Sequence, residues 1–248
     1  MRRFHINKIN EKDGFCIFPP SEAHHIVKVL RMKEGDNLVI MDNDGQRFLA
    51  QITYASRHEV RANFLKQLPS PSSSPVEITL CQSILKSKHM DYMIQKTSEL
   101  GVNHIIPFIS ERTTVKLKHE KKNARIKRWE EIALNAAKQS DMRMVPKIDI
   151  PVQFNSMITR FDKNNALKII LYEGESDCDM KRLLKGSSFN KIIGLVGPEG
   201  GFSIEEVESA KKADFVPVSM GKRILRAETA AVIIMAIVQY ESGDLCLL

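Results

Sequence analysis

The sequence lacks the features that mark membrane, secreted and disulfide-bonded proteins. No apolar run in its 248 residues approaches the length of a membrane span, and the first residues, MRRFHINKINEKDG, contain no apolar signal core. The four cysteines are scattered and form no C-x-x-C pair, which is typical of reduced thiols that act as small packing residues. These absences favour a cytoplasmic protein with no attachment to a membrane.

The sequence also lacks the common signatures of metal and nucleotide sites. Its seven histidines form no cluster with ligand spacing, so we expect no metal. The glycine-rich stretch Gly197–Gly201, GPEGG, has neither the G-x-G-x-x-G spacing of a dinucleotide site nor the pattern of a P-loop. This stretch therefore predicts neither of those two phosphate-binding loops.

Positive charge is concentrated in one segment. The chain has a net charge of +7, and Arg112–Lys147 alone contains eleven Lys or Arg against four Asp or Glu, a balance of +7. The rest of the chain is therefore neutral overall. A basic segment on a neutral protein favours a polyanion such as nucleic acid as the partner, although a solvated helix face also explains part of this charge.

The first part of the chain, residues 1–68, predicts a small β domain. An Asp-Gly pair at Gly45 is a hairpin signal. One helix is expected over Ser21–Arg31, with Ser21 as its N-cap. Several short strands with one helix are typical of a barrel. The expected strands are Asn37–Met41, Gln46–Tyr54 and Val60–Leu65.

A proline- and serine-rich linker, residues 69–75, separates this domain from a second one over residues 76–248. Strands and helices alternate in the second domain, which predicts an α/β fold with a largely parallel sheet. The expected strands are Val76–Gln82, His104–Ile109, Lys168–Tyr172, Ile192–Val196 and Phe215–Ser219. The expected helices are Lys88–Leu100, Ala124–Ser140, Asp177–Lys185, 203–213 and one that begins at Glu228. Ser203 and Glu206 form a capping box at the start of the helix over 203–213.

Two glycine-bearing loops follow the last two expected strands. The first is GPEGG, and the second begins at Met220-Gly221. Ligands of open α/β sheets bind at the carboxyl ends of strands, and glycine lets the backbone approach a ligand closely. Two ordinary strand-to-helix turns would give the same spacing, so the pattern alone leaves both interpretations open.

The residues of these loops resemble a known family. GPEGGFS followed by MGKRILRAETA is similar to the cofactor loops of the SPOUT methyltransferases, and most closely to the bacterial 16S rRNA uridine N-3 methyltransferases. QKTSELGVNHIIPFISERT (Gln95–Thr113), AAKQSDMRMVP (Ala136–Pro146) and LYEGE (Leu171–Glu175) are similar to further motifs of that family. Lys138 and Met220 depart from its usual residues. AHHIVKVLRMKEGD (Ala23–Asp36) is similar to its PUA-like domain.

The resemblance implies a PUA-like β-barrel followed by an α/β domain whose carboxyl-terminal segment forms a trefoil knot. It also implies S-adenosylmethionine as the cofactor, bound in that knot. The cofactor-binding residues that it implies are Leu171, Tyr172, Glu173, Val196, Gly197, Pro198, Gly200, Gly201, Ser219, Met220, Gly221, Ile224, Leu225, Arg226, Thr229 and Ala230.

Methylation of a uridine imide nitrogen requires removal of its proton and stabilisation of the charge that spreads to the carbonyl oxygens. Arg226 is our candidate for holding a carbonyl. Glu199 is a candidate for the base or for orienting its loop. Glu228 is a further candidate, but an acid at a helix start is also favoured by the helix dipole.

The substrate that the resemblance implies is 16S rRNA, within the small ribosomal subunit. Expected RNA contacts are His24, Arg31, Arg112, Lys116, Gln139, Ser140, Arg143 and Arg223. Two alternatives remain open at this point: a SPOUT enzyme that acts on tRNA, and an RNA-binding protein that has kept the fold but lost catalysis.

The last expected helix predicts an oligomer. Between Ala230 and Val238 it is apolar on every side, so it must be covered all round, whereas the sheet covers one side only. Neighbouring helices or the same region of a second subunit would cover the rest. Because SPOUT enzymes usually dimerise through this region, we expect a homodimer with Ala231–Val238 partly in the interface.

Overall fold

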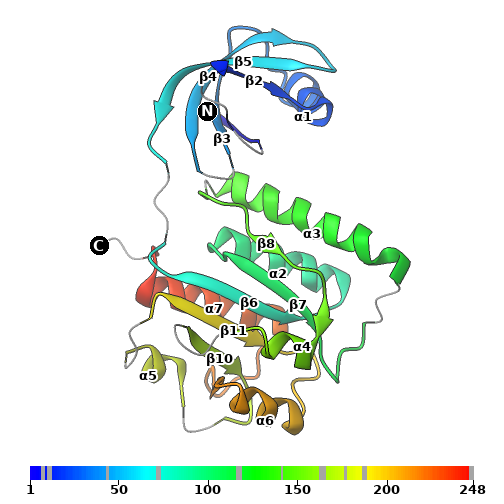
Figure 1. Cartoon of the computed structure of the whole chain (residues 1–248), viewed down its shortest axis with the longest axis vertical. Coiled ribbons are helices and arrows are strands. Elements are labelled where there is room, and N and C mark those ends of the chain that lie inside the picture. Colours follow the sequence, from blue (N-terminus) through cyan, green and yellow to red (C-terminus); the bar gives the residue numbers. More distant parts are fainter. Residues whose placement is uncertain are drawn as a thin grey trace. The chain divides into compact units, whose positions relative to one another are not determined.

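A computed structural model describes most of the chain, namely residues 1–6, 9, 13–42, 45–70, 74–115, 119–140, 142–161, 166–175, 178–185 and 189–245. The chain forms two compact units. The first consists of Met1–Ser72 with Ala137–Met144, and the second of Ser73–Ala136 with Val145–Leu248. Figure 1 shows strands dominating the amino-terminal part, and strands and helices alternating in the rest. No helix in the described part is long and apolar enough to cross a membrane.

The first unit is built on a curled five-stranded sheet in the order β1-β3-β4-β5-β2. Only the pair β1–β3 is parallel, and the register of the expected hairpin places Leu38 opposite Ala50. Phe18, Leu38 and Ile52 are buried in its core. The small β domain predicted from the sequence is therefore present. Its strands are β1 (Arg2–His5), β2 (Phe15–Phe18), β3 (Asn37–Met41), β4 (Arg47–Ala55) and β5 (Val60–Leu68).

The helix of the first unit differs from the prediction. The structure has α1 (Pro20–His24), followed by a π-helical turn, η2 (His25–Val29). Pro19 is the N-cap and gives no side-chain hydrogen bond, so the expectation that Ser21 caps a helix reaching Arg31 was wrong. Proline suits the first helical position because its missing N–H would have no partner there, so Pro20 begins the helix before Ser21.

The second unit contains a sheet in the order β12-β10-β11-β6-β7-β8, with β9 also paired to β7. Every pairing in this sheet is parallel among the described residues, as predicted. The two shortest strands that pair with β7, β8 and β9, were not predicted. The strands are β6 (Glu77–Ser83), β7 (His104–Ile109), β8 (Lys147–Ile148), β9 (Val152–Gln153), β10 (Leu167–Leu171), β11 (Lys191–Val196) and β12 (Val216–Val218).

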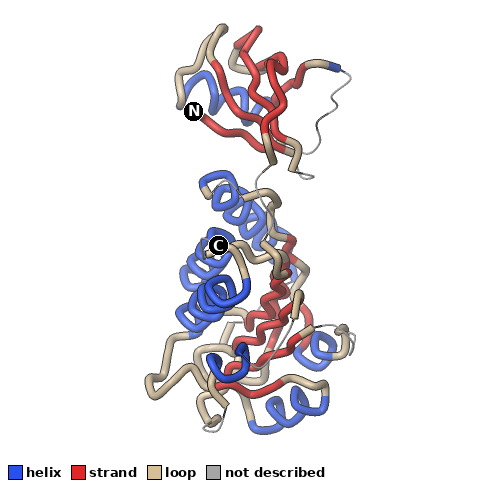
Figure 2. The backbone as a smooth tube through the Cα atoms, turned by 90° about the vertical axis from the view of Figure 1, so that its left-hand side faces the viewer, coloured by secondary structure: helices blue, strands red, loops and turns tan. Residues whose placement is uncertain are grey.

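Helices cover both faces of this sheet, as Figure 2 shows with the sheet nearly edge-on. Side chains of successive strand residues pack into two different cores, one on each face of the sheet. Ile169 and Ile192 belong to the core that includes α2 and α7. Their neighbours Ile170 and Ile193 belong to the core that includes α4 and α6. Strands buried on both faces explain the continuous apolar runs in the sequence. The helices are α2 (Ser87–Glu99), α3 (His119–Gln139), α4 (Phe154–Ile158), α5 (Met180–Lys185), α6 (Ile204–Lys212) and α7 (Ala227–Ser242). The expected knot remains a prediction.

The predicted capping box at the start of α6 is confirmed, and it extends beyond its own helix. Ser203 accepts a hydrogen bond from the backbone N–H of Glu206, and the Glu206 carboxylate accepts one from the N–H of Ser203. The same buried carboxylate also accepts hydrogen bonds from the Ser110 hydroxyl and the Glu111 N–H, each at 3.0 Å. Glu206 therefore joins the loop after β7 to the start of α6.

We predict that Glu206→Ala lowers the stability of the protein by about 2–3 kcal/mol, because three donors, two of them buried, lose their acceptor. Thermal unfolding followed by circular dichroism would measure the shift. Glu205→Ala is the matched control, because Glu205 is exposed in the same helical turn and its removal should change stability by less than about 0.5 kcal/mol. Equal shifts for the two variants would contradict the role assigned to Glu206.

Candidate functional site

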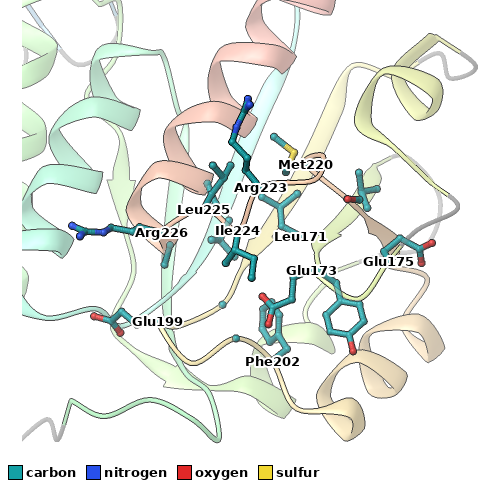
Figure 3. A pocket seen from close by; sticks show the side chains of 18 of the residues that line it. Leu171, Glu173, Glu175, Glu199, Phe202, Met220, Arg223, Ile224, Leu225 and Arg226 are labelled. Carbon is teal, nitrogen blue, oxygen red and sulfur yellow. The ribbon is translucent and has the colours of Figure 1, made fainter.

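A cavity of about 880 Å³ lies at one edge of the parallel sheet. Its walls come mainly from three loops, which follow β10, β11 and β12. The volume lies within the range of roughly 300–1,000 Å³ that small-molecule sites usually have. Figure 3 shows the side chains of these loops gathered around it.

The sheet order explains why these three loops meet. β10 pairs on one side with β12 and on the other with β11, and all three run parallel. In this register Leu171 lies opposite Val218, and Ile170 lies opposite Leu195. All three strands therefore end at the same edge, which is where open α/β sheets bind ligands.

The loop after β11 is fixed by hydrogen bonds from the Gln82 side chain and by a tight turn that ends at Gly201. The buried amide of Gln82 donates to the carbonyl oxygens of Val196 (3.4 Å) and Gly197 (3.2 Å). Gly201 has a φ of +69°, and its N–H donates to the Pro198 carbonyl at 3.0 Å. A side chain at Gly201 would also meet the Glu173 carboxylate at 2.8 Å. The positive φ therefore favours glycine at this position, whereas the Glu173 side chain could move to make space for a Cβ atom.

The loops after β10 and β12 are joined to each other. The N–H of Tyr172 donates to the Val218 carbonyl at 3.1 Å, and the N–H of Ser219 donates to the Cys178 carbonyl at 2.9 Å. Partial burial, with the nearby carboxylates of Glu175 and Asp179, raises the pKa of the Cys178 thiol. The thiol beside the cavity therefore stays protonated, which does not suit a nucleophile.

The lining of the cavity combines apolar surface with charges of both signs. Leu171, Val196 and Leu225 provide apolar walls that suit a flat aromatic ring. Acidic side chains come from the segment after β10, and basic ones come from the segment before α7. Figure 3 shows Glu173 and Glu175 on one side of the opening, and Arg226 on the other. The acidic lining residues of that segment are Glu173, Glu175 and Asp179; the basic ones are Lys222, Arg223 and Arg226.

One histidine lies between two glutamates at this cavity. Nδ1 of His89, in the first turn of α2, is 3.6 Å from Oε1 of Glu228 and 3.9 Å from Oε1 of Glu199. Glu228 is in the first turn of α7 and is only 8% exposed. Oε1 of Glu199 also lies 3.4 Å from the N–H of Lys86. This group connects the start of α2 with the first glycine-bearing loop and with the start of α7.

The predicted cofactor residues almost all gather in this cavity. Of the sixteen, only Thr229 is missing from its lining. Of the three catalytic candidates, Arg226 is exposed at the N-cap of α7, and Glu199 and Glu228 flank His89. Among the described residues, the Arg226 guanidinium has no ion-pair or hydrogen-bond partner, so it is available to a ligand.

The expected RNA contacts divide between the two units. Arg223 lines the cavity, and Arg112 donates to the carbonyl of Gly200 at 3.1 Å, so it supports the cofactor loop. The others that the structure describes belong to the first unit, and Lys116 lies outside the described residues. Those in the first unit are His24, Arg31, Gln139 and Arg143, which are exposed, and Ser140, which is half-buried.

Several lining residues were missed by the sequence reasoning: His89, Glu175, Asp179, Phe202, Val218, Lys222 and Ala227. Most are direct neighbours of residues that were named. His89 is different, because it follows another strand, β6, which pairs with β11. The sequence does show that His89 lies at the start of a helix that follows an expected strand. This position predicts a place at the binding edge only once the strand order is known.

The donor set of the cavity suits an organic cofactor. No group of three or more His, Cys, Asp or Glu side chains that would hold a metal occurs within the described ranges. Apolar walls suit an adenine ring, and the carbonyl and N–H groups of the loops suit the polar edge of that ring. The carboxylates suit the ribose hydroxyl groups and the ammonium group of an amino-acid moiety. The residues present therefore fit S-adenosylmethionine.

Two family models match the chain. An RNA methyltransferase domain matches residues 72–239, and an RNA methyltransferase PUA domain matches residues 18–65. A ribosomal RNA small subunit methyltransferase E from Buchnera aphidicola is 34% identical over 98% of this chain and 94% of its own length. A protein of the same name from Bacillus subtilis is 31% identical over 98% of this chain and 97% of its own length.

Solved structures give the same result. A ribosomal RNA small subunit methyltransferase E from Neisseria gonorrhoeae, bound to S-adenosylmethionine, aligns with a TM-score of 0.90 at 31% identity, over 99% of this chain and 100% of that one. A putative methyltransferase from Legionella pneumophila in complex with the same cofactor aligns with a TM-score of 0.90 at 30% identity, over 98% of each chain. These matches support an α/β domain with a mostly parallel sheet preceded by a PUA-like domain, as the sequence predicted.

Proposed function

The chain belongs to the RNA methyltransferase family, and from that premise we propose that it transfers a methyl group from S-adenosylmethionine to N-3 of a uridine in 16S rRNA. The observation that carries the proposal is the cavity at three adjacent parallel strand ends, lined by fifteen of the sixteen expected cofactor residues. The names of the relatives support small-subunit rRNA as the substrate, and the cofactor in two structural neighbours supports the donor. We further propose that the protein acts in the cytoplasm.

The protein contributes two things to this reaction: it aligns the reacting atoms, and it stabilises the charge that develops. When bound, the cofactor supplies a methyl group on a positively charged sulfur. The imide nitrogen of uridine lies between two carbonyl groups, and it becomes a nucleophile when its proton leaves. The protein must place that nitrogen in line with the methyl group and the sulfur.

Arg226 is suited to stabilise the uracil anion. Its guanidinium is exposed at the cavity and is free of partners among the described residues, so it can donate to a carbonyl oxygen on which negative charge develops. Glu199 and Glu228 lie at the same cavity and stay candidates for the proton acceptor. The acidic side chains of the segment after β10 suit the positively charged donor.

RNA binding is proposed for the exposed basic and polar residues outside the cavity as well. His24, Arg31 and Arg143 are exposed in the first unit, and Arg223 is exposed beside the catalytic candidate. Arginine and lysine side chains neutralise phosphates and position RNA without reading its sequence. The choice of uridine must therefore come from the cavity and the shape of the RNA.

We also propose a homodimer formed through α7. Ala231, Ile234 and Met235 are fully buried within one chain. The opposite side of the helix, with Val232, Ile233 and Ala236, is only half-buried, and Tyr240 is 62% exposed. An apolar helix face left open to solvent is typical of a subunit interface.

The proposed substrate is tested by mass analysis of RNA from a strain that lacks the protein. We expect one N-3-methyluridine to disappear from 16S rRNA and to return when the wild-type chain is supplied. Loss of a tRNA modification with unchanged rRNA would identify tRNA as the substrate instead. Absence of any heat of binding with S-adenosylmethionine well above micromolar concentrations would favour an RNA-binding protein without catalysis.

We predict that Arg226→Ala lowers turnover about 100-fold, the usual cost of removing one donor to a developing anion, whereas cofactor affinity changes less than about threefold. Steady-state kinetics and calorimetry separate the two quantities. Arg223→Ala is the control on the same loop: it should raise KM for RNA and leave kcat nearly unchanged. A large rise in the cofactor dissociation constant with normal turnover for Arg226→Ala would refute the assignment.

Light scattering at low micromolar concentration should give twice the 28.2 kDa mass of one chain. Ile233→Glu should give monomers, because it places a charge in the apolar face of α7 that the partner covers. Ile204→Glu is the control, since Ile204 is 67% exposed on α6 and its substitution should leave the dimer intact. A monomeric wild-type protein with full activity would exclude the proposed dimer.

A further inference from the structure

We propose that His89 is a positioning residue that joins the first glycine-bearing loop of the cavity to the start of α7 by acting as the shared cation of Glu199 and Glu228. This inference deepens the proposed function, on which it rests for its catalytic consequence, but its structural content is independent of it. Each of the three residues comes from a different segment: α2, the loop after β11, and α7.

Of the two glutamates, Glu228 has the greater need of a compensating charge. Glu199 is exposed to water and also lies 3.4 Å from the backbone nitrogen of Lys86. Glu228 is 8% exposed, and its Oε2 has no hydrogen-bond partner in the described part of the chain. Among the described residues, no other Lys, Arg or His side chain lies within 4.0 Å of either carboxylate. A carboxylate that is removed from water needs an opposite charge or hydrogen bonds, and the His89 ring is the group in place to supply them.

The geometry points to charge attraction rather than a single hydrogen bond. Nδ1 of His89 is itself buried and without a hydrogen-bond partner among the described residues. It lies 3.6 Å from one carboxylate and 3.9 Å from the other, which is beyond ordinary hydrogen-bond length but within ion-pair distance. A cation at this position attracts both carboxylates at once, and Glu228 gains most from it because it is shielded from water.

The position of the group explains why it would affect the cofactor site. Glu199 lies between Pro198 and Gly200 of the first loop, and Glu228 follows Arg226 by two residues. A cation that binds both carboxylates therefore holds the first loop, the start of α7 and the start of α2 in one arrangement. We infer that His89 sets the positions of the loop backbone at Gly197–Gly201 and of the Arg226 guanidinium.

His89 is one of several cationic side chains near this place. Other charged groups at this place are Arg226 on the loop before α7, and Lys86 and Lys88 beside His89 in sequence. Replacing His89 by lysine keeps all of them and the positive charge, so a comparison of the two proteins isolates the imidazole.

The test uses His89→Gln, which removes the charge, and His89→Lys, which makes it permanent. We expect His89→Gln to raise the dissociation constant of S-adenosylmethionine about tenfold, the effect of losing one charged contact of typical strength. His89→Lys should bind within about threefold of the wild type, because it keeps a cation at this position. His58→Gln is the matched control, because His58 is exposed on the loop between β4 and β5.

A second measurement needs no cofactor. In the apoprotein, His89→Gln should have a lower thermal stability than the wild type, and His89→Lys should lie closer to the wild type because it keeps a cation beside the buried Glu228. If the wild type binds no S-adenosylmethionine, the proposed function fails while this measurement still decides the role of His89.

Two results would overturn the inference. One is that both His89 variants match the wild type in cofactor affinity and in thermal stability. The other is that both variants fold and bind the cofactor normally but lose turnover, because that would make His89 the acceptor of the uridine proton instead of a cation that positions loops. Rescue by His89→Lys separates these roles, since a permanently charged ammonium accepts no proton.

Discussion

The parallel hydrogen bonding of β12, β10 and β11 is the constraint on which the cavity depends. These strands follow one another in the chain with a helix between each pair, and their register brings Leu171 beside Val218 and Ile170 beside Leu195. Their loops therefore leave the sheet at one edge, and each loop is then fixed by contacts with another segment: Gln82 holds one, and the bond from Ser219 to Cys178 holds another. The binding site thus depends first on the positions of the strand ends and then on these contacts between segments.

Charge is distributed in the cavity in a way that suits two different ligands. The segment after β10 contributes carboxylates, and the segment before α7 contributes Arg223 and Arg226. The methyl donor carries a positive charge at sulfur, so the acidic wall favours it. RNA is a polyanion, so the basic wall favours RNA. A cavity of uniform sign would strengthen the binding of one ligand and weaken that of the other. Glu199 and Glu228 are exceptions beside the basic segment, and they lie next to His89.

Features with local causes were predictable from the sequence. The capping box of Ser203 and Glu206, the β3–β4 hairpin and the alternation in the second unit all depend on residues close together in the chain. Short strands were not predictable, because β8 and β9 have two residues each and exist only through pairing with β7. The helix at Ser21 was misplaced because Pro20, which suits the first helical position, begins it one residue earlier.

The same distinction applies to the site. The two glycine-bearing loops could be located because glycine and apolar strands leave a pattern in one stretch of sequence, and the family resemblance then supplied their role. His89 has no such pattern: it follows a strand more than a hundred residues before β11, and only the pairing of β6 with β11 places it beside Glu199. The Glu206 contacts with Ser110 and Glu111 have the same origin. Sequence reasoning therefore identifies segments that form a site, whereas the electrostatic contacts between those segments follow from the order of the strands.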